Sequence, residues 1–202
     1  MINHDPEFVI TLQRVIEFIG TFAFALSGIR LAASKHYDWL GGFVCGIAVA
    51  IGGGTIRDVM LGVRPFWMLS PIYMICTLFA QCVVIVCHHY LRRLDTTWFL
   101  FDTLGLALFN IAGIQKTLEC GFPFWVAIIM GCITGAAGGV IRDVLLNEEP
   151  VIFIKEIYAM ACVVGGLTYW LLSWLQVSLY ITVIATFAIV CAIRFLAVRY
   201  HI

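Results

Sequence analysis

The chain has 202 residues, of which 62% are hydrophobic and 12% are charged, and its mean hydropathy is +1.01. A soluble domain needs far more polar surface, so this composition predicts an integral membrane protein. The formal net charge is zero, which offers no basic face to nucleic acid, and no hydrophilic segment is long enough for a separate soluble domain. We therefore expect a single membrane domain over residues 1–202. The polar start, Met1 to Glu7, lacks the basic region and cleavage site of a secretory signal, so the first span should be retained.

Apolar segments of spanning length follow one another along the chain. A helix rises about 1.5 Å per residue, so about 20 apolar residues cross the hydrocarbon core of a bilayer. By this measure we predict seven spans, the last of which begins after a polar dip at residues 173–178. The spans cover about residues 12–33, 39–62, 66–91, 98–116, 122–146, 151–172 and 177–199.

The chain is an internal duplication with an offset of 85 residues. Residues 52–58, GGGTIRD, recur as residues 137–143, AGGVIRD, and the flanking sequences align without a gap. Repeat one covers about residues 12–91, repeat two covers about 97–172, and a seventh helix follows at about 177–199. Each copy contains three spans, an odd number, so we expect the second copy to enter the membrane with the opposite polarity. Two inverted copies suggest a transport fold with a site at the repeat interface.

The basic residues are distributed unevenly between the two sides of the expected bundle. Eight Lys and Arg residues fall on the side of the C-terminus and four on the side of the N-terminus. The positive-inside rule then predicts a cytoplasmic C-terminus and an N-terminus that lies outside the cell or in a lumen. On the cytoplasmic side, Lys35, Arg92 and Arg93 form a basic rim that could bind anionic lipid headgroups, although ordinary topology determinants explain them equally well.

The glycines of the repeated motif allow two interpretations. Gly costs about 1 kcal/mol relative to Ala in a helix interior, so a run of glycines favours a break whose freed backbone groups line a polar pathway. The alternative is close packing of two helices through small residues. For Gly52, Gly53 and Gly54 we favour the kink, because a packing interface would space its glycines by four residues. Gly138 and Gly139 form the second kink, expected to be milder because Ala137 stands where the first copy has a glycine.

Arg57, Asp58, Arg142 and Asp143 place four charges at membrane depth. An unpaired charge at the centre of a spanning helix costs about 2.5–3.5 kcal/mol, so these groups must be paired or in contact with water. Neighbours in sequence point about 100° apart on a helix, so we expect each residue to find its partner elsewhere. They form either a structural ion-pair lock or part of a pore or substrate site, and ionisable groups at membrane depth favour the second interpretation.

Glu17 and Asp102 occupy equivalent positions near the starts of the first and fourth spans. They could be helix caps or interfacial acids, or partners of the intramembrane arginines. Counted along their spans, Glu17 and Arg57 both lie in the outer part of the membrane, and Asp102 and Arg142 both lie in the inner part. We therefore predict the ion pairs Glu17–Arg57 and Asp102–Arg142, one toward each mouth. The acids that follow the two arginines would then face the path and attract cations.

The sequence contains no catalytic constellation. It has no convincing Ser/His/Asp spacing and no glycine loop for phosphate after a strand, and its carboxylates are too few for a metal centre. We expect neither an enzyme nor a protein with a metal or an organic cofactor.

At the doubled motif, GGGTIRDVMLGVRP and AGGVIRDVLLNEEP, the sequence resembles the prokaryotic branch of the trimeric intracellular cation (TRIC) channels. That branch overlaps a bacterial membrane family for which a glycine transporter role has been proposed, and the resemblance covers nearly the whole chain. It implies seven spans with inverted three-helix repeats, and a homotrimer with one pore per protomer that passes monovalent cations such as potassium. At the matching positions, the pore kinks are residues 52–54 and 138–139, beside the polar pairs Arg57–Asp58 and Arg142–Asp143.

We therefore expect a potassium channel, with the kinked second and fifth helices lining its pore. The alternative is a secondary transporter of a small solute such as glycine, and a third possibility is a purely structural membrane protein. The channel and the transporter both need a polar path at the membrane midplane, so the sequence does not choose between them. The expected partners are monovalent cations, membrane lipids and further copies of the same chain, with no nucleic acid.

Overall fold

The computed structural model describes residues 6–87, 97–154 and 156–200, and these ranges contain helices and no strand. In chain order the elements are α1 (Pro6–Ser34), α2 (Trp39–Met60), the 3-10 helix η1 (Phe66–Leu69), α3 (Ile72–Val86), α5 (Thr97–Glu119), α6 (Phe124–Leu145), α7 (Val151–Ile154), α8 (Glu156–Trp174) and α9 (Leu179–Tyr200). Among the described residues, six helices are long and apolar enough to cross a membrane, while α3 is apolar but has only 15 residues. The protein is an all-α, multi-pass membrane protein.

Two of the seven expected spans begin differently from the prediction. The span expected over residues 66–91 starts with η1, and α3 begins only after Ser70 and Pro71. The span expected over residues 151–172 starts with the four-residue helix α7 before α8. Proline has no backbone N–H to continue a helix, which accounts for the interruption before α3. Residues 88–91 lie outside the described residues, and the other five spans agree with the prediction to within several residues.

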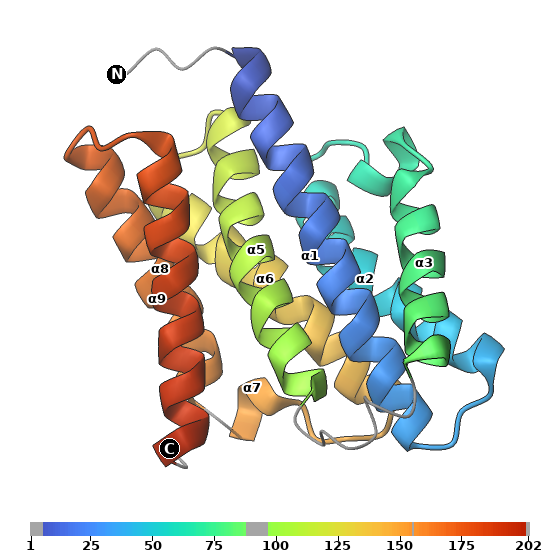
Figure 1. The fold of residues 1–202 in the computed structure, drawn as a ribbon. Coiled ribbons are helices and arrows are strands. Elements are labelled where there is room, and N and C mark those ends of the chain that lie inside the picture. Colours follow the sequence, from blue (N-terminus) through green and yellow to red (C-terminus); the bar gives the residue numbers. More distant parts are fainter. Residues whose placement is uncertain (1–5, 88–96, 155, 201–202) are drawn as a thin grey trace.

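Four helices form the centre of the bundle. α5 packs against α1 and α6, and α2 packs against the same two helices. α3 flanks α1 on one side, while α8 and α9 pair with each other on the opposite side of the centre (Figure 1). α1 begins at one end of the bundle and α9 finishes at the other end (Figure 1). The central four helices belong two to each copy of the repeat, so the copies meet along the middle of the molecule.

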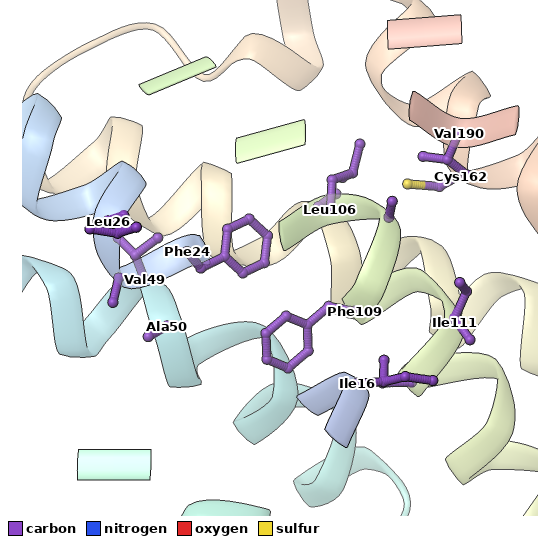
Figure 2. Close-up of a cluster of buried hydrophobic side chains, with 14 of the residues drawn as sticks. Ile16, Phe24, Leu26, Val49, Ala50, Leu106, Phe109, Ile111, Cys162 and Val190 are labelled. Atoms are coloured by element: carbon purple, nitrogen blue, oxygen red, sulfur yellow. The ribbon is translucent and has the colours of Figure 1, made fainter. Parts of the chain in front are cut away.

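Two equivalent phenylalanines lie where the copies meet. Phe24 of α1 and Phe109 of α5 stack with ring centroids 5.4 Å apart and planes 15° apart (Figure 2). Both side chains are 1% exposed. Each ring also covers a glycine on the opposite helix: a Cβ at Gly20 would lie 3.0 Å from Phe109, and one at Gly105 would overlap Phe24. The glycines therefore let α1 and α5 approach closely around the aromatic pair.

Corresponding helices of the two copies, 85 residues apart, end with the same backbone conformation. A residue with positive φ follows α2 at Gly62 (70°) and α6 at Asn147 (53°). Another pair follows α1 at His36 (62°) and α5 at Gly121 (81°). A left-handed residue just after a helix lets the following N–H groups bond the last free carbonyls. The duplicated sequence thus ends corresponding helices with the same backbone geometry.

The distribution of side chains is that of a protein surrounded by lipid. Large apolar residues face outward, among them Trp39, Val86 and Phe153, which are 70%, 81% and 82% exposed. Charged and polar groups lie inside instead, including several intramembrane arginines and carboxylates. Buried charges need partners, so the polar interior is the place to look for function.

Candidate functional site

α2 and α6 contact each other through the glycines of the repeated motif. A Cβ at Gly53 would overlap the carbonyl oxygen of Thr134 in α6, and a Cβ at Gly138 would lie 2.9 Å from the carbonyl oxygen of Val49 in α2. Residues 53 and 138, and residues 49 and 134, are equivalent, so the contact is reciprocal. Both helices run without interruption through these glycines. Neither helix is broken at these glycines, and in this conformation the glycines serve close packing of α2 against α6. That the second and fifth helices are kinked and line a pore stays a prediction.

The other motif glycines face other neighbours. An added Cβ at Gly52 would overlap Ile141 of α6, and one at Gly54 would overlap the ring of Phe66 in η1. A Cβ at Gly139 would overlap the hydroxyl of Tyr158 in α8. Successive helical residues point about 100° apart, so a run of glycines serves a helix that is crowded on several sides at one level. A spacing of four residues between glycines is expected only where one neighbouring helix is contacted, and α2 and α6 each have several neighbours at this level.

The first charge cluster consists of Glu17 of α1, Arg57 and Asp58 of α2, and Tyr73 of α3. Arg57 Nη2 donates to Glu17 Oε1 at 2.9 Å, and Arg57 Nε donates to Asp58 Oδ1 at 2.7 Å. The Tyr73 hydroxyl donates to Glu17 Oε2 at 3.3 Å. Glu17, Arg57 and Asp58 are 5%, 0% and 1% exposed. One buried guanidinium therefore bridges two buried carboxylates.

The second charge cluster repeats this arrangement 85 residues later, with Asp102 of α5, Arg142 and Asp143 of α6, and Tyr158 of α8. Arg142 Nη1 donates to Asp102 Oδ1 at 2.6 Å, and Arg142 Nε donates to Asp143 Oδ1 at 2.9 Å. The Tyr158 hydroxyl donates to Asp102 Oδ1 at 3.4 Å. Both ion pairs expected from the depth argument, Glu17–Arg57 and Asp102–Arg142, are thus present in the structure.

The two arginines also pair with the next residue in the chain, which the sequence argument had excluded. That argument compared Cα–Cβ directions, but the long arginine side chain curls back so that its Nε reaches the neighbouring carboxylate. The planar guanidinium then presents its Nε edge to one acid and an Nη group to the other, a fork geometry available to arginine and not to lysine. The expectation that Arg57 and Asp58, or Arg142 and Asp143, could not face each other is therefore wrong.

Asp58 and Asp143 are structural acceptors in this conformation. The second oxygen of Asp58 accepts a hydrogen bond from the backbone N–H of Phe66 at 2.7 Å, and that of Asp143 accepts one from Val151 at 3.1 Å. Phe66 opens η1 and Val151 opens α7, so each acid holds the start of the next element. The prediction that these acids are free to face a path is not met, because both of their oxygens are engaged and both residues are buried.

The second cluster has two contacts that the first cluster lacks. Arg194 of α9 donates from Nη2 to Asp102 Oδ2 at 3.2 Å, and Ser27 Oγ accepts from Arg142 Nη1 at 2.9 Å. The position equivalent to Ser27 in the second copy is Ala112, which has no hydroxyl. Accordingly, Arg57 Nη1 has no hydrogen-bond partner among the described residues.

A cavity of about 960 Å³ opens beside the first cluster. Glu17, Arg57, Asp58 and Tyr73 all line it, together with apolar side chains of α1 and α3. Four further charged residues complete its wall: Arg14, Arg64, Lys116 and Glu119. Lys116 Nζ pairs with Glu119 at 3.2 Å. The first cluster thus borders a cavity whose wall combines apolar side chains with charged ones.

The predicted lipid-binding rim is described only in part. Lys35 pairs with Glu148, and both side chains are about half exposed. Arg92 and Arg93 lie outside the described residues. The structure therefore adds an acidic partner to Lys35 and leaves the lipid role a prediction.

Three functional side chains were missed by the sequence reasoning. Tyr73 and Tyr158 align in the duplication, and this equivalence alone could have suggested a common role in the clusters. Arg194 is the one charge before Arg199 in an otherwise apolar α9, which marks it as a buried and paired residue. In the sequence analysis, Arg194 contributes only to the count of charges that predicts the topology.

Comparisons with known proteins agree with this architecture. Residues 14–89 and residues 99–174 each match the family described as Glycine transporter, so the family unit occurs twice at the offset of the repeat. The UPF0126 inner membrane protein YadS of Escherichia coli (strain K12) is 37% identical over 191 residues, covering 93% of this chain and 92% of that protein. The UPF0126 membrane protein of Vibrio cholerae is 35% identical over 196 residues, covering 95% of this chain and 81% of that protein.

Solved structures share the fold. The TRIC trimeric intracellular cation channel orthologue from Rhodobacter sphaeroides superposes with a TM-score of 0.87 at 28% identity, over 95% of this chain and 100% of that one. A prokaryotic TRIC channel crystallised in 0.5 M KCl gives a TM-score of 0.88 at 26% identity, over 95% and 98% of the two chains. The fold and the paired clusters thus define a membrane protein of the TRIC architecture, a class of channels and not of enzymes. The chain belongs to the glycine transporter family, whose members include the UPF0126 proteins.

Proposed function

We propose that the protein is a monovalent cation channel of the prokaryotic inner membrane, selective for potassium, that assembles as a homotrimer with one pore in each protomer. The observation that carries the proposal is the likeness over nearly the whole chain to structures described as TRIC cation channels, at TM-scores of 0.81 to 0.88. We infer the trimer from the name of that class, the trimeric intracellular cation channels. The buried charge clusters support a polar route through each protomer, since ionisable groups at membrane depth mark ion pathways.

The path runs along α2 and α6 between the two charge clusters, and the glycine contact is its gate. Gly53 and Gly138 bring the two backbones together too closely to admit even a methyl group. Gly52, Gly54 and Gly139 extend the same tight layer, so we interpret this conformation as closed. Opening would separate α2 from α6 at this level, while Arg57–Asp58 and Arg142–Asp143 would line the path on either side.

We further propose that the chain is an inverted repeat of three helices plus a seventh helix, α9, with repeat one at about residues 12–91 and repeat two at about 97–172. Equivalent cluster contacts, reciprocal glycine contacts and the Phe24–Phe109 stack support a pseudo-twofold axis. The distribution of Lys and Arg supports an external N-terminus and a cytoplasmic C-terminus.

Single-channel recording tests the proposed function. Purified protein in planar bilayers with a KCl gradient should give resolved unitary currents whose reversal potential lies toward that of potassium. Gly42→Ala is a matched control on α2, because the nearest atom to its new Cβ would be Gln81 Oε1 at an ordinary 3.8 Å. This variant should conduct like the wild type. Absence of unitary currents from well-assembled protein would contradict the proposal.

A secondary transporter of glycine is the second candidate, favoured by the description of the matching family. Such a protein would take up radiolabelled glycine into proteoliposomes with saturable kinetics and without unitary currents. The same preparation should be used for both assays, so that the two outcomes can be compared directly.

A further inference from the structure

The final helix adds a positive charge to only one of two otherwise equivalent clusters. In the first cluster, Glu17 pairs with Arg57 at Oε1 and accepts the Tyr73 hydroxyl at Oε2. Among the described residues, Arg57 is the one basic side chain within ion-pair distance of Glu17. In the second cluster, Arg142 and Tyr158 share Asp102 Oδ1, and Arg194 occupies Oδ2. The repeated motif is therefore complete without Arg194.

Arg194 is held tightly in this place. It is 3% exposed, and its guanidinium carbon lies 4.7 Å from the centroid of the Phe99 ring and 4.4 Å from that of Tyr158. Two aromatic faces and a carboxylate together make a favourable site for a cation. α9 lies outside the duplicated unit, so this contact joins a separate helix to the end of the charge network. The second cluster thereby has two basic and two acidic groups, while the first has one basic group for two acids.

The two clusters also differ in whether they border the large cavity. The first cluster lines the 960 Å³ cavity. No residue of the second cluster lines this cavity. The cluster with the additional arginine therefore lies apart from it.

From this contrast we infer that Arg194 is a gating residue: its guanidinium occupies the cation position beside Asp102 and closes the second-cluster end of the path. The inference rests on the proposed channel function and adds a regulatory element to it. A permeating cation competes with Arg194 for Asp102 Oδ2, because two positive charges close to one carboxylate oxygen repel each other. Movement of α9 relative to α5 then controls conduction.

The test compares three full-length variants in planar bilayers. Arg194→Gln should raise the potassium conductance or the open probability several-fold, because the blocking charge is gone. Arg194→Lys keeps the charge and should stay near the wild type. Arg199→Gln, on the exposed face of the same helix, is the matched control and should also resemble the wild type. An unchanged or lower conductance in correctly assembled Arg194→Gln would overturn the inference.

A double variant covers the case in which Arg194→Gln does not fold. Asp102→Asn with Arg194→Gln leaves Arg142 paired with Asp143, so the cluster carries no excess charge. It should fold and conduct more than the wild type. Conductance at or below the wild-type value in this folded variant would count against a blocking role.

A thermal unfolding assay separates failure of this inference from failure of the proposed function. At constant ionic strength, replacing N-methylglucamine chloride with KCl should raise the Tm of Arg194→Gln more than that of the wild type, since a cation that binds the folded state stabilises it. Adding Asp102→Asn should remove this extra stabilisation. The wild type could show no unitary currents while KCl still raises the Tm of Arg194→Gln more than that of the wild type. The channel proposal would then fail, but the inference that Arg194 occupies a cation site beside Asp102 would stand. Equal Tm shifts in wild type and Arg194→Gln would refute that position.

Discussion

At the scale of single residues, each buried arginine of the two clusters serves two carboxylates at once. Arg57 lies between Glu17 and Asp58, and Arg142 lies between Asp102 and Asp143. A buried ion pair gains little over an apolar replacement, but removing one member leaves an uncompensated charge. The clusters therefore hold α1 to α2 and α5 to α6 through arginines whose loss would leave two buried carboxylates without a cation.

The energetic coupling of Glu17 and Arg57 is measurable by a double-mutant cycle. We expect Arg57→Gln, which leaves Glu17 and Asp58 without their cation, to lower the free energy of unfolding by about 3–5 kcal/mol. Glu17→Gln leaves Arg57 paired with Asp58 and should cost less, and the double variant should cost less than the sum of the two. The exposed pair Lys116–Glu119 is the control, where Glu119→Gln should cost less than about 1 kcal/mol. Denaturant titration of the detergent-solubilised protein gives the four values. Additive costs would show that the 2.9 Å contact carries no coupling.

Gly53 is the residue with the least room for a side chain. Because a Cβ there would overlap a backbone oxygen of α6, Gly53→Ala should destabilise the protein by about 1–3 kcal/mol through displacement of the helices. Gly42→Ala, on the same helix with free space, should be neutral or should stabilise by up to about 1 kcal/mol through helix propensity. Equal Tm values for the two variants would argue against close helix packing at Gly53.

At the scale of elements, equivalent helices meet around equivalent residues. α1 and α5 pack through the Phe24–Phe109 stack, with Gly20 and Gly105 beneath the rings, and α2 and α6 pack through their motif glycines. Each helix pair joins counterparts from the two copies, and the residue contacts within each pair are reciprocal. Such reciprocal contacts are the intramolecular form of an isologous interface between two identical subunits.

The Phe24–Phe109 stack should therefore behave symmetrically. Phe24→Ala and Phe109→Ala should each cost about 3–5 kcal/mol, by similar amounts, because both rings are fully buried at the same junction. Their double variant should cost less than the sum, since each ring is the other's neighbour. Phe153→Ala is the control, with a side chain that is 82% exposed, and should change stability by less than about 0.5 kcal/mol. A clear difference between the two single variants would contradict the symmetric interpretation.

At the scale of the whole molecule, the outward faces of the helices are apolar and the charged groups lie along the centre. A polar route through each protomer is compatible with this distribution. If the proposed pore lies within each protomer, assembly would bury protomer surface and would not be required to form the path.

We expect the purified protein to be a homotrimer. Native mass spectrometry or light scattering corrected for detergent should give three times the chain mass of 22.5 kDa. Proteoliposomes crosslinked before solubilisation provide the corresponding measurement in lipid. A mass of one or two chains in both environments would exclude the trimer.

The orientation of the chain can be read from reporter fusions. Alkaline phosphatase, which is active only outside the cytoplasm, should be active at the N-terminus and inactive at the C-terminus. Green fluorescent protein fused to the C-terminus should fluoresce, because it matures in the cytoplasm. The reverse pattern would show that the positive-inside count, eight basic residues against four, does not set the topology.

The sequence by itself determined the membrane class, the duplication and the depth of its charges. Hydropathy needs only composition and length, so five of the spanning helices agree with their predicted bounds to within several residues. The fixed offset of 85 residues made Glu17 and Asp102 equivalent, and helix rise placed each near its arginine in depth. The family resemblance followed from the same motif, because the motif combines rare features, consecutive glycines and intramembrane charges, in a fixed order.

Tertiary structure decided everything that depends on what surrounds a helix. Gly53 is a packing residue in this conformation because α6 lies against it, and the sequence of α2 contains no information on that neighbour. Arg57 reaches both Asp58 and Glu17 with one guanidinium, which periodicity does not describe. Arg194 joins the second cluster because α9 packs against α5, outside the duplicated unit. Local patterns fix depth and register along one helix, whereas the partners of a side chain depend on contacts between distant segments.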